Sequence, residues 1–304
     1  MSFGKFAKLN TGATIPLVGF GTWQSKPNVV KQAVKVAILN GYRHIDGAWI
    51  YGNEVEVGEG IKEAIKELNI PREEIFVTTK LWNNSHRPQE VLPALEVSLK
   101  NLGLDYVDLY LMHWPLAFKS GSVPVTRDAD NNIVLEPVDI TETFKAMEAL
   151  VATGKVKAVG VSNFSIKNLE KLAAACKTVP AVNQVELHPE NPQEELLEYC
   201  KSKGIHLTAY SPLGSTDSPL IKLDEVSKIA QKHNSQNANV LIAWARQRGT
   251  SVIPKSVTES RIISNFQDIE LDEEDLKVLK SLTEGKASFR YCDPAKFWGL
   301  DIFN

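Results

Sequence analysis

Cysteine is scarce in this sequence. Its 304 residues include three cysteines, Cys176, Cys200 and Cys292, which lie far apart and form no CxxC or Cys/His pattern. A sparse, odd count in a chain of this length is typical of reduced thiols in the cytoplasm, and the spacing provides no set of metal ligands. We therefore expect a cytoplasmic protein without a bound metal.

Long apolar runs and an excess of one charge are absent as well. The N-terminal residues contain no apolar stretch of the kind found in signal peptides, and no run approaches the roughly 18 apolar residues that span a bilayer. The 34 basic and 37 acidic residues leave a net charge of −3, with neither sign segregated along the chain. The sequence therefore favours a protein that binds neither nucleic acid nor a membrane surface.

The GxGxxG turn of the dinucleotide-binding fold is missing too. The length permits either two domains or one α/β barrel of about 250 residues. The two-domain alternative requires that turn, but the glycine pairs 19/21 and 58/60 both lack the third glycine. No shift in composition marks a linker, so we expect a single domain over residues 1–304, in which any dinucleotide is held by another device.

What the chain does contain is a regular alternation of short apolar runs with longer amphipathic segments. Eight runs have strand length and the nearly continuous apolar character of a parallel sheet buried on both faces: 17–20, 44–46, 75–80, 107–113, 158–162, 181–185, 206–210 and 251–255. Helical patterns follow at 28–40, 54–68, 88–101, 140–153, 166–176, 192–203, 221–233 and 259–266. This alternation predicts a closed (β/α)8 TIM barrel of the α/β class.

Three segments fall outside the repeat. Residues 6–17 precede the first unit and are interpreted as an N-terminal β-hairpin that plugs the bottom of the barrel. The long loop 114–138 follows the fourth strand, on the face where barrel active sites lie, and the tail 284–304 follows the last helix. Long irregular segments are more often functional than not, so we expect the loop and the tail to set substrate specificity.

Four polar residues stand at or just past the strand ends of the catalytic face. Asp46 ends the second strand and Tyr51 follows it, while Lys80 ends the third strand and His113 the fourth. Each alone would more often be a cap or a solvated surface group. Parallel barrel strands, however, deliver their C-terminal residues to one shared rim. The sequence therefore predicts that these four side chains meet.

Together the four side chains are suited to protonating a forming alkoxide. A phenol with the ordinary pKa of about 10 is a poor acid near neutral pH, and the Lys80 ammonium is expected to lower the pKa of Tyr51. Asp46 would pair with Lys80 and hold its geometry. His113 can donate a hydrogen bond to a carbonyl oxygen. No serine or cysteine nucleophile adjoins this group in the sequence.

The residues around these four positions resemble the aldo-keto reductase family, in particular its fungal aldehyde, aldose and glycerol-type members. The motifs that carry the resemblance are 41–54 (GYRHIDGAWIYGNE), 77–82 (VTTKLW), 108–115 (DLYLMHWP), 159–164 (VGVSNF), 183–189 (NQVELHP), 209–215 (AYSPLGS) and 253–265 (IPKSVTESRIISN). The resemblance implies NADPH-dependent reduction of aldehydes or ketones to alcohols. It makes Tyr51 the proton donor, supported by Asp46 and Lys80, with His113 orienting the carbonyl.

The resemblance also implies a cofactor site that prefers NADPH over NADH. The residues expected at the nicotinamide end are Thr22, Trp23, Asp46, Ser162, Asn163, Gln184 and Tyr210, whose ring stacks on the nicotinamide. Those expected along the pyrophosphate are Ser211, Leu213, Ser215 and Asp217. Those expected at the 2′-phosphate, on a strand–helix junction that favours anions, are Lys255, Ser256, Thr258, Arg261 and Asn265.

The substrate end is expected to have aromatic walls. Its candidate residues are Trp23, Trp49, Tyr51, Trp82, His113, Trp114 and Trp298. Two residues depart from the commonest family pattern, since Gly47 replaces a small hydroxyl or thiol residue and Trp49 a smaller side chain. The loop after Tyr210 is also short. Trp244, within an amphipathic helical segment, is expected in the core.

A second hypothesis remains open at this point. The same fold could serve a catalytically silent NADPH-binding regulatory or structural protein, since one fold supports unrelated functions. All four catalytic residues argue against it, because a silent descendant has no chemical need for them. A small-molecule carbonyl compound is thus the expected partner, with a monomer or weak homodimer as the expected assembly.

Overall fold

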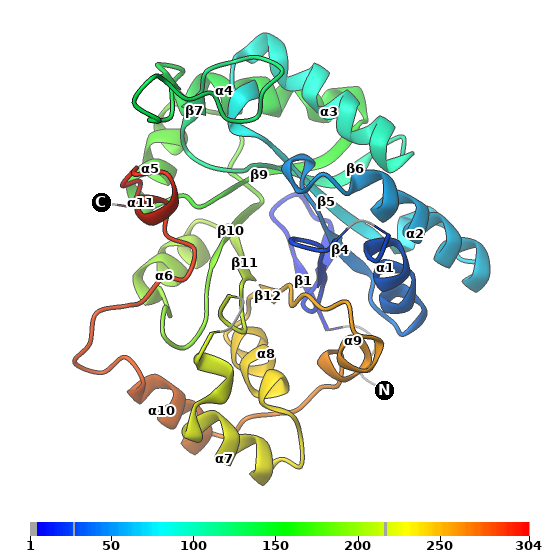
Figure 1. Ribbon diagram of the computed structural model, residues 1–304, viewed down its shortest axis with the longest axis vertical. Helices are drawn as coiled ribbons and strands as arrows, with labels where there is room; N and C mark the ends of the chain where they lie inside the picture. The colour runs from blue at the N-terminus through cyan, green and yellow to red at the C-terminus, as the bar shows by residue number, and fades with distance from the viewer. Residues whose placement is uncertain (1–4, 27, 216–217, 304) are drawn as a thin grey trace.

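Eight parallel strands form the centre of the molecule (Figure 1) in the computed structural model, which describes residues 5–26, 28–215 and 218–303. In spatial order they are β3 (Phe20–Gly21), β4 (His44–Asp46), β5 (Phe76–Leu81), β6 (Val107–Met112), β9 (Val156–Ser162), β10 (Val182–Glu186), β11 (His206–Tyr210) and β12 (Ser251–Val252). A parallel bridge between Val18 and Val252 closes the two edges against each other. The predicted barrel is confirmed.

Helices surround the strands (Figure 1), as buried strands joined by crossover helices require. They are α1 (Val30–Leu39), α2 (Glu54–Leu68), α3 (Pro88–Leu102), α4 (Ile140–Leu150), α5 (Ile166–Ala175), α6 (Glu194–Ser202), α7 (Asp224–Lys232), α8 (Asn237–Gln247), α9 (Glu259–Asn265), α10 (Glu273–Ser281) and α11 (Pro294–Phe297). None of the helices in the described ranges is long and apolar enough to cross a membrane.

Helix α8 is an additional helix between β11 and β12, around Trp244. Its residues from Ala238 to Arg246 are all buried, and Trp244 lies in the core as expected. Helices α10 and α11 are absent from the expected pattern. Leu276 and Leu279 of α10 lie three residues apart and pack on the core, so its helical pattern could have been recognised, whereas α11 has four residues and is too short to show a period.

The expected hairpin plugs one end of the barrel. β1 (Phe6–Lys8) pairs antiparallel with β2 (Thr14–Pro16). Leu9 and Ile15 are buried in one cluster with residues that lie mostly at or near the starts of the strands, namely Phe76, Leu109, Leu111, Ala158, Ala181 and Val182. The apolar plug therefore seals the end of the barrel opposite the strand ends that carry the predicted catalytic residues.

The loop 114–138 and the tail 284–304 meet over the other end. Within the loop, β7 (Ala117–Phe118) pairs antiparallel with β8 (Leu135–Glu136). Phe118 and Ile133 form a cluster with Trp82 and Trp114, against which Trp298 of the tail packs. From α10 the tail runs past α6 to α11 (Figure 1).

Candidate active site

The four predicted catalytic residues converge at the C-terminal rim of the barrel. Asp46 ends β4, Tyr51 ends the short 3-10 helix η1 (Trp49–Tyr51), Lys80 lies near the end of β5, and His113 directly follows β6. The Lys80 ammonium donates to Asp46 Oδ1 at 2.6 Å and to the Gly47 carbonyl at 2.8 Å. It lies 3.4 Å from the Tyr51 hydroxyl. Lys80 thus links the carboxylate to the phenol.

The electrostatics of Tyr51 differ from the sequence-based expectation. Burial raises the pKa of Tyr51 well above its ordinary value, and the nearby Asp46 carboxylate raises it further. Burial lowers the pKa of Lys80, which Asp46 opposes. The expected lowering of the Tyr51 pKa by Lys80 is therefore wrong, because the loss of solvation outweighs an ammonium whose charge Asp46 largely offsets. The phenol keeps its proton at neutral pH, as a proton donor must.

His113 is a neutral imidazole in the same wall. Burial lowers its pKa well below the usual value, and Lys80 adds to this lowering. Its ring centroid lies 5.9 Å from that of Tyr51 and 5.2 Å from that of Trp82, both with edge-to-face geometry. A neutral ring carries one N–H donor, so it can orient a carbonyl oxygen without competing with Tyr51 as an acid.

These side chains border a cavity of about 1170 Å³ that extends from the catalytic group to α9. Its wall contains Asp46, Tyr51 and His113, while Lys80 lies behind it. It also contains most residues predicted for the cofactor and the substrate, which are Thr22, Trp23, Ser162, Asn163, Gln184, Tyr210, Ser211, Leu213, Ser215, Lys255, Ser256, Arg261, Asn265, Trp82, Trp114 and Trp298.

Besides Lys80, three predicted residues are not among those that line this wall. Trp49 borders a separate cavity of about 270 Å³ beside Val55 and Asn101, so it does not narrow the mouth of the large one. Thr258 caps the start of α9, where its main-chain N–H donates to the Ser256 hydroxyl at 3.1 Å. Thr258 is exposed to solvent, outside the wall of the large cavity. Asp217 lies outside the described residues.

A chain of amide side chains connects the predicted cofactor residues to the catalytic group. Gln184 Nε2 donates to Asp46 Oδ2 at 2.6 Å, and Asn163 Nδ2 donates to the His113 carbonyl at 3.0 Å. The Tyr210 hydroxyl donates to Asn163 Oδ1 at 2.8 Å. Asn163 and Ser211 both have positive φ, at 65° and 47°, directly after β9 and β11. Such strained backbone clusters at ligand sites.

The far end of the cavity has the chemistry of a phosphate site. Lys255 and Arg261 line it, and neither forms an ion pair with a carboxylate of the described residues. The Lys255 ammonium has one weak contact there, with the Gln24 carbonyl at 3.2 Å. Two cations without an acidic partner, beside the buried hydroxyl of Ser256, fit the 2′-phosphate of NADPH.

The wall also includes residues that sequence reasoning missed. Tyr291, Cys292 and Phe297 come from the tail, and Gln236 and Asn237 come from the start of α8. The aromatic composition of the tail identifies the whole segment as a candidate for contact with the substrate. It does not single out these positions, since an irregular segment has no periodicity that assigns side chains to a face.

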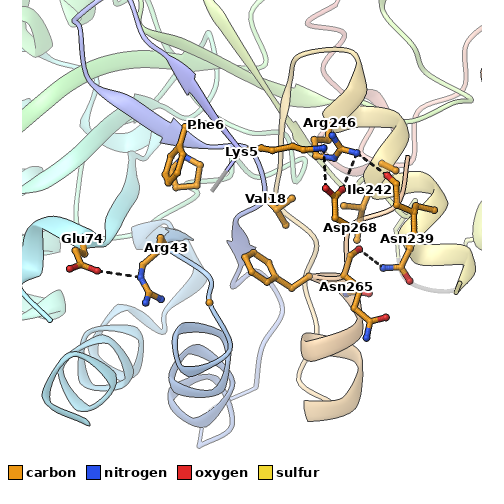
Figure 2. Close-up of a pocket in the computed structure, with 16 residues that line it drawn as sticks. Lys5, Phe6, Val18, Arg43, Glu74, Asn239, Ile242, Arg246, Asn265 and Asp268 are labelled. Atoms are coloured by element: carbon orange, nitrogen blue, oxygen red, sulfur yellow. Dashed lines mark hydrogen bonds and ion pairs between the residues drawn. The ribbon is translucent and has the colours of Figure 1, made fainter. Parts of the chain in front are cut away.

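A second cavity, of about 300 Å³, lies at the plugged end and is shown in Figure 2. Its cations are paired within the protein: Lys5 and Arg246 meet at Asp268, each about 3 Å from the carboxylate, with Lys5 at 3.0 Å and Arg246 at 2.9 Å. Arg43 lies 3.7 Å from Glu74. None of the four catalytic residues lines this cavity, so we assign it no part in the reaction.

Comparison with known proteins gives a consistent result. The family model described as the aldo/keto reductase family matches residues 17–284. The chain is 50% identical over 300 residues to glycerol 2-dehydrogenase (NADP(+)) of Saccharomyces cerevisiae, covering 95% of this chain and 94% of that protein. It is 45% identical over 319 residues to D/L-glyceraldehyde reductase of Hypocrea jecorina, covering 100% and 96%.

The solved structures agree with the sequence relatives. The structure of the aldose reductase from Schistosoma japonicum matches with a TM-score of 0.92 at 40% identity, covering 98% of this chain and 97% of that one. The chain therefore belongs to the aldo/keto reductase family. It is an NADPH-dependent oxidoreductase that reduces carbonyl groups to alcohols, as the sequence predicted.

Proposed function

We propose that this enzyme reduces small hydroxyaldehydes of the glyceraldehyde class, with Tyr51 as the proton donor. The observation that carries the proposal is the Tyr51 hydroxyl in the cavity wall, 3.4 Å from a Lys80 ammonium that Asp46 holds at 2.6 Å. Two relatives support the substrate class, since one is named for glyceraldehyde and another for glycerol.

Bound in the cavity, NADPH supplies the hydride that reduces the carbonyl carbon. The residues that would hold it are the amide side chains of Asn163 and Gln184, the segment 211–215, and the cations Lys255 and Arg261 at α9. Tyr51 gives its proton to the carbonyl oxygen, and the adjacent Lys80 ammonium stabilises the phenolate that remains. Asp46 keeps Lys80 in place. His113 donates to the carbonyl oxygen and orients it.

The substrate end is bounded by three indole rings in contact. Trp298 lies 6.0 Å from Trp82 and 5.0 Å from Trp114 between ring centroids, with steep interplanar angles. Such walls accept the C–H faces of small polyols, while Tyr51 and His113 offer polar groups to the carbonyl. This arrangement supports a compact, polar carbonyl compound as the substrate.

The substitution Tyr51→Phe tests the proton donor. It removes one hydroxyl and leaves the ring, so we expect kcat/KM for DL-glyceraldehyde to fall by about 10²- to 10⁴-fold while NADPH still binds. Both quantities follow from NADPH absorbance and from a fluorescence titration. Full turnover by the variant would show that another group supplies the proton.

The silent NADPH-binding alternative finds no support in the site, because all four catalytic residues are in contact or close to one another. NADPH binding without turnover across a carbonyl panel would restore it. We further propose a monomer or weak homodimer in the cytoplasm, on the grounds of unpaired cysteines and a barrel that closes its own core.

A further inference from the structure

Glu186 is a fully buried carboxylate to which the reaction gives no role. It ends β10 at the catalytic rim, and its side chain has no exposed surface. A buried carboxylate is costly unless hydrogen bonds replace the lost water. The identity of its partners therefore indicates what the group does.

Three donors converge on this carboxylate. The main-chain N–H of Tyr291 donates to Oε1 at 2.7 Å, and that of Cys292 donates to Oε2 at 2.9 Å. His188 Nε2 lies 2.8 Å from Oε1. Two of the three donors are successive main-chain N–H groups of the tail, so Glu186 binds the tail through its backbone. This contact does not depend on the tail's side chains.

The loop that follows β10 adds further hydrogen bonds to the tail. The Glu190 carbonyl accepts from the main-chain N–H of Phe289 at 2.9 Å, and the Glu190 carboxylate accepts from the Tyr291 hydroxyl at 2.6 Å. Gln193 Nε2 donates to the Glu186 carbonyl at 2.7 Å, which fixes the loop to the strand. Residues 289–292 of the tail are thus attached to one strand end.

This attachment lies directly beside the reaction. Gln184, two residues earlier on β10 and so on the same face of the strand, donates to Asp46. From the other direction, Tyr291 and Cys292 line the large cavity, and so do Phe297 and Trp298 a few residues later. A single strand therefore carries both a contact to the catalytic carboxylate and the anchor of the substrate wall.

We propose that Glu186 is a positioning residue that fixes the tail as the substrate wall and so determines which carbonyl compounds bind. The proposal rests on the proposed function for its substrate part, because it assigns Trp298 to the substrate end. The proposal predicts different effects on substrate binding and on proton transfer. Loosening the tail weakens binding of substrates that reach Trp298, whereas proton transfer from Tyr51 is unchanged.

The substitution Glu186→Gln tests this role, with Glu195→Gln as its control. The glutamine removes the charge and turns an NH2 group towards one of the two main-chain N–H groups of the tail. Glu195, exposed on α6, loses the same charge without any tail contact. We expect KM for benzaldehyde to rise about tenfold in E186Q, the size of one lost charge-assisted hydrogen bond, with kcat for glyceraldehyde nearly unchanged.

Amide hydrogen exchange provides a readout that is independent of activity. In the unmodified enzyme, the amides of Tyr291 and Cys292 should exchange at least about tenfold more slowly than those of Ala287 and Ser288, which have no main-chain partner in the described residues. In E186Q this protection should be lost while strand β10 stays protected. Equal exchange at all four positions of the unmodified enzyme would overturn the anchor, whether or not the variant folds.

A double substitution separates the anchor from the proposed function. If Glu186 acts by placing Trp298, E186Q should change KM for benzaldehyde little further in a W298A background. Additive effects would overturn the role in positioning the wall. An enzyme inactive on every carbonyl compound, but with protected tail amides, would instead contradict the proposed function and leave the anchor in place.

Discussion

At this site, burial among neighbouring side chains determines the acid–base properties of single residues. Tyr51 illustrates the point, since the Lys80 ammonium lies 3.4 Å away and yet the pKa of the phenol is raised. The loss of water around the phenol, together with the Asp46 carboxylate, outweighs the cation. An acid stabilised in its protonated form delivers its proton only when a stronger base, such as a forming alkoxide, is present.

This electrostatic arrangement predicts the pH dependence of carbonyl reduction. A proton donor is active below its pKa and loses activity as the pH rises through it. Because the pKa of Tyr51 is raised above its ordinary value near 10, kcat/KM for glyceraldehyde with NADPH should stay level from neutral pH to about pH 9. Initial rates across this range, corrected for enzyme stability, provide the measurement. A decline with a midpoint near pH 7 or 8 would mean that Tyr51, or Lys80 with its lowered pKa, loses a proton within this range.

The convergence of the four proposed catalytic residues at one rim could be predicted from the sequence, but the directions of their pKa shifts could not. Asp46, Lys80 and His113 stand at the ends of recognisable strands, and parallel strands deliver such positions to one rim. The extent of burial around Tyr51 depends on the loop 114–138 and the tail, which have no periodic pattern. Glu186 escaped prediction for the same reason, because its partners are main-chain groups about 100 residues away in the sequence.

At the scale of the secondary-structure elements, strands were easier to predict than the segments that cover them. Each strand is a nearly continuous apolar run buried on both faces, so its position can be read from composition alone. Helix α10 carries Leu276 and Leu279 at helical spacing, but it lies outside the eight expected strand–helix units and so was not predicted. The hairpin is an exception, since the interpretation of residues 6–17 as a hairpin is confirmed by the pairing of β1 with β2.

The hairpin plug is predicted to contribute stability without affecting catalysis. Ile15→Ala removes a fully buried side chain from the cluster at the sealed end, which should lower the free energy of unfolding by about 2 to 5 kcal/mol. Thr14→Ala, one residue earlier on the exposed side of β2, should change it by less than about 0.5 kcal/mol. Urea unfolding gives both values. A kcat that falls together with the stability would indicate that the plug supports the catalytic rim as well.

At the scale of the whole molecule, the long cavity should couple cofactor binding to stability. A ligand that binds only the folded state at about 100 times its Kd raises the free energy of unfolding by about 2.7 kcal/mol. Lys255→Met removes one of the two cations that line the cavity beside α9, so at a fixed NADPH concentration the rise in Tm should shrink. Thermal unfolding with NADPH and with NADH measures the effect.

The comparison of the two cofactors identifies what Lys255 recognises. NADH has no 2′-phosphate, so its smaller shift in Tm should be the same in the Lys255→Met variant and in the unmodified enzyme. A variant that loses both shifts equally would show that Lys255 holds a part common to the two cofactors. The place of Asp217 along the pyrophosphate stays a prediction, since Asp217 lies outside the described residues.

The position of Leu9 and Ile15 has a consequence for the route by which substrates and products enter and leave the cavity. The side chains of Leu9, Ile15 and their neighbours fill that end of the barrel, so among the described residues the barrel axis is blocked there. NADPH and the aldehyde enter, and NADP+ and the alcohol leave, through the same opening, which the tail borders. The products of one turnover must therefore leave the cavity before the next substrate can enter by the same route.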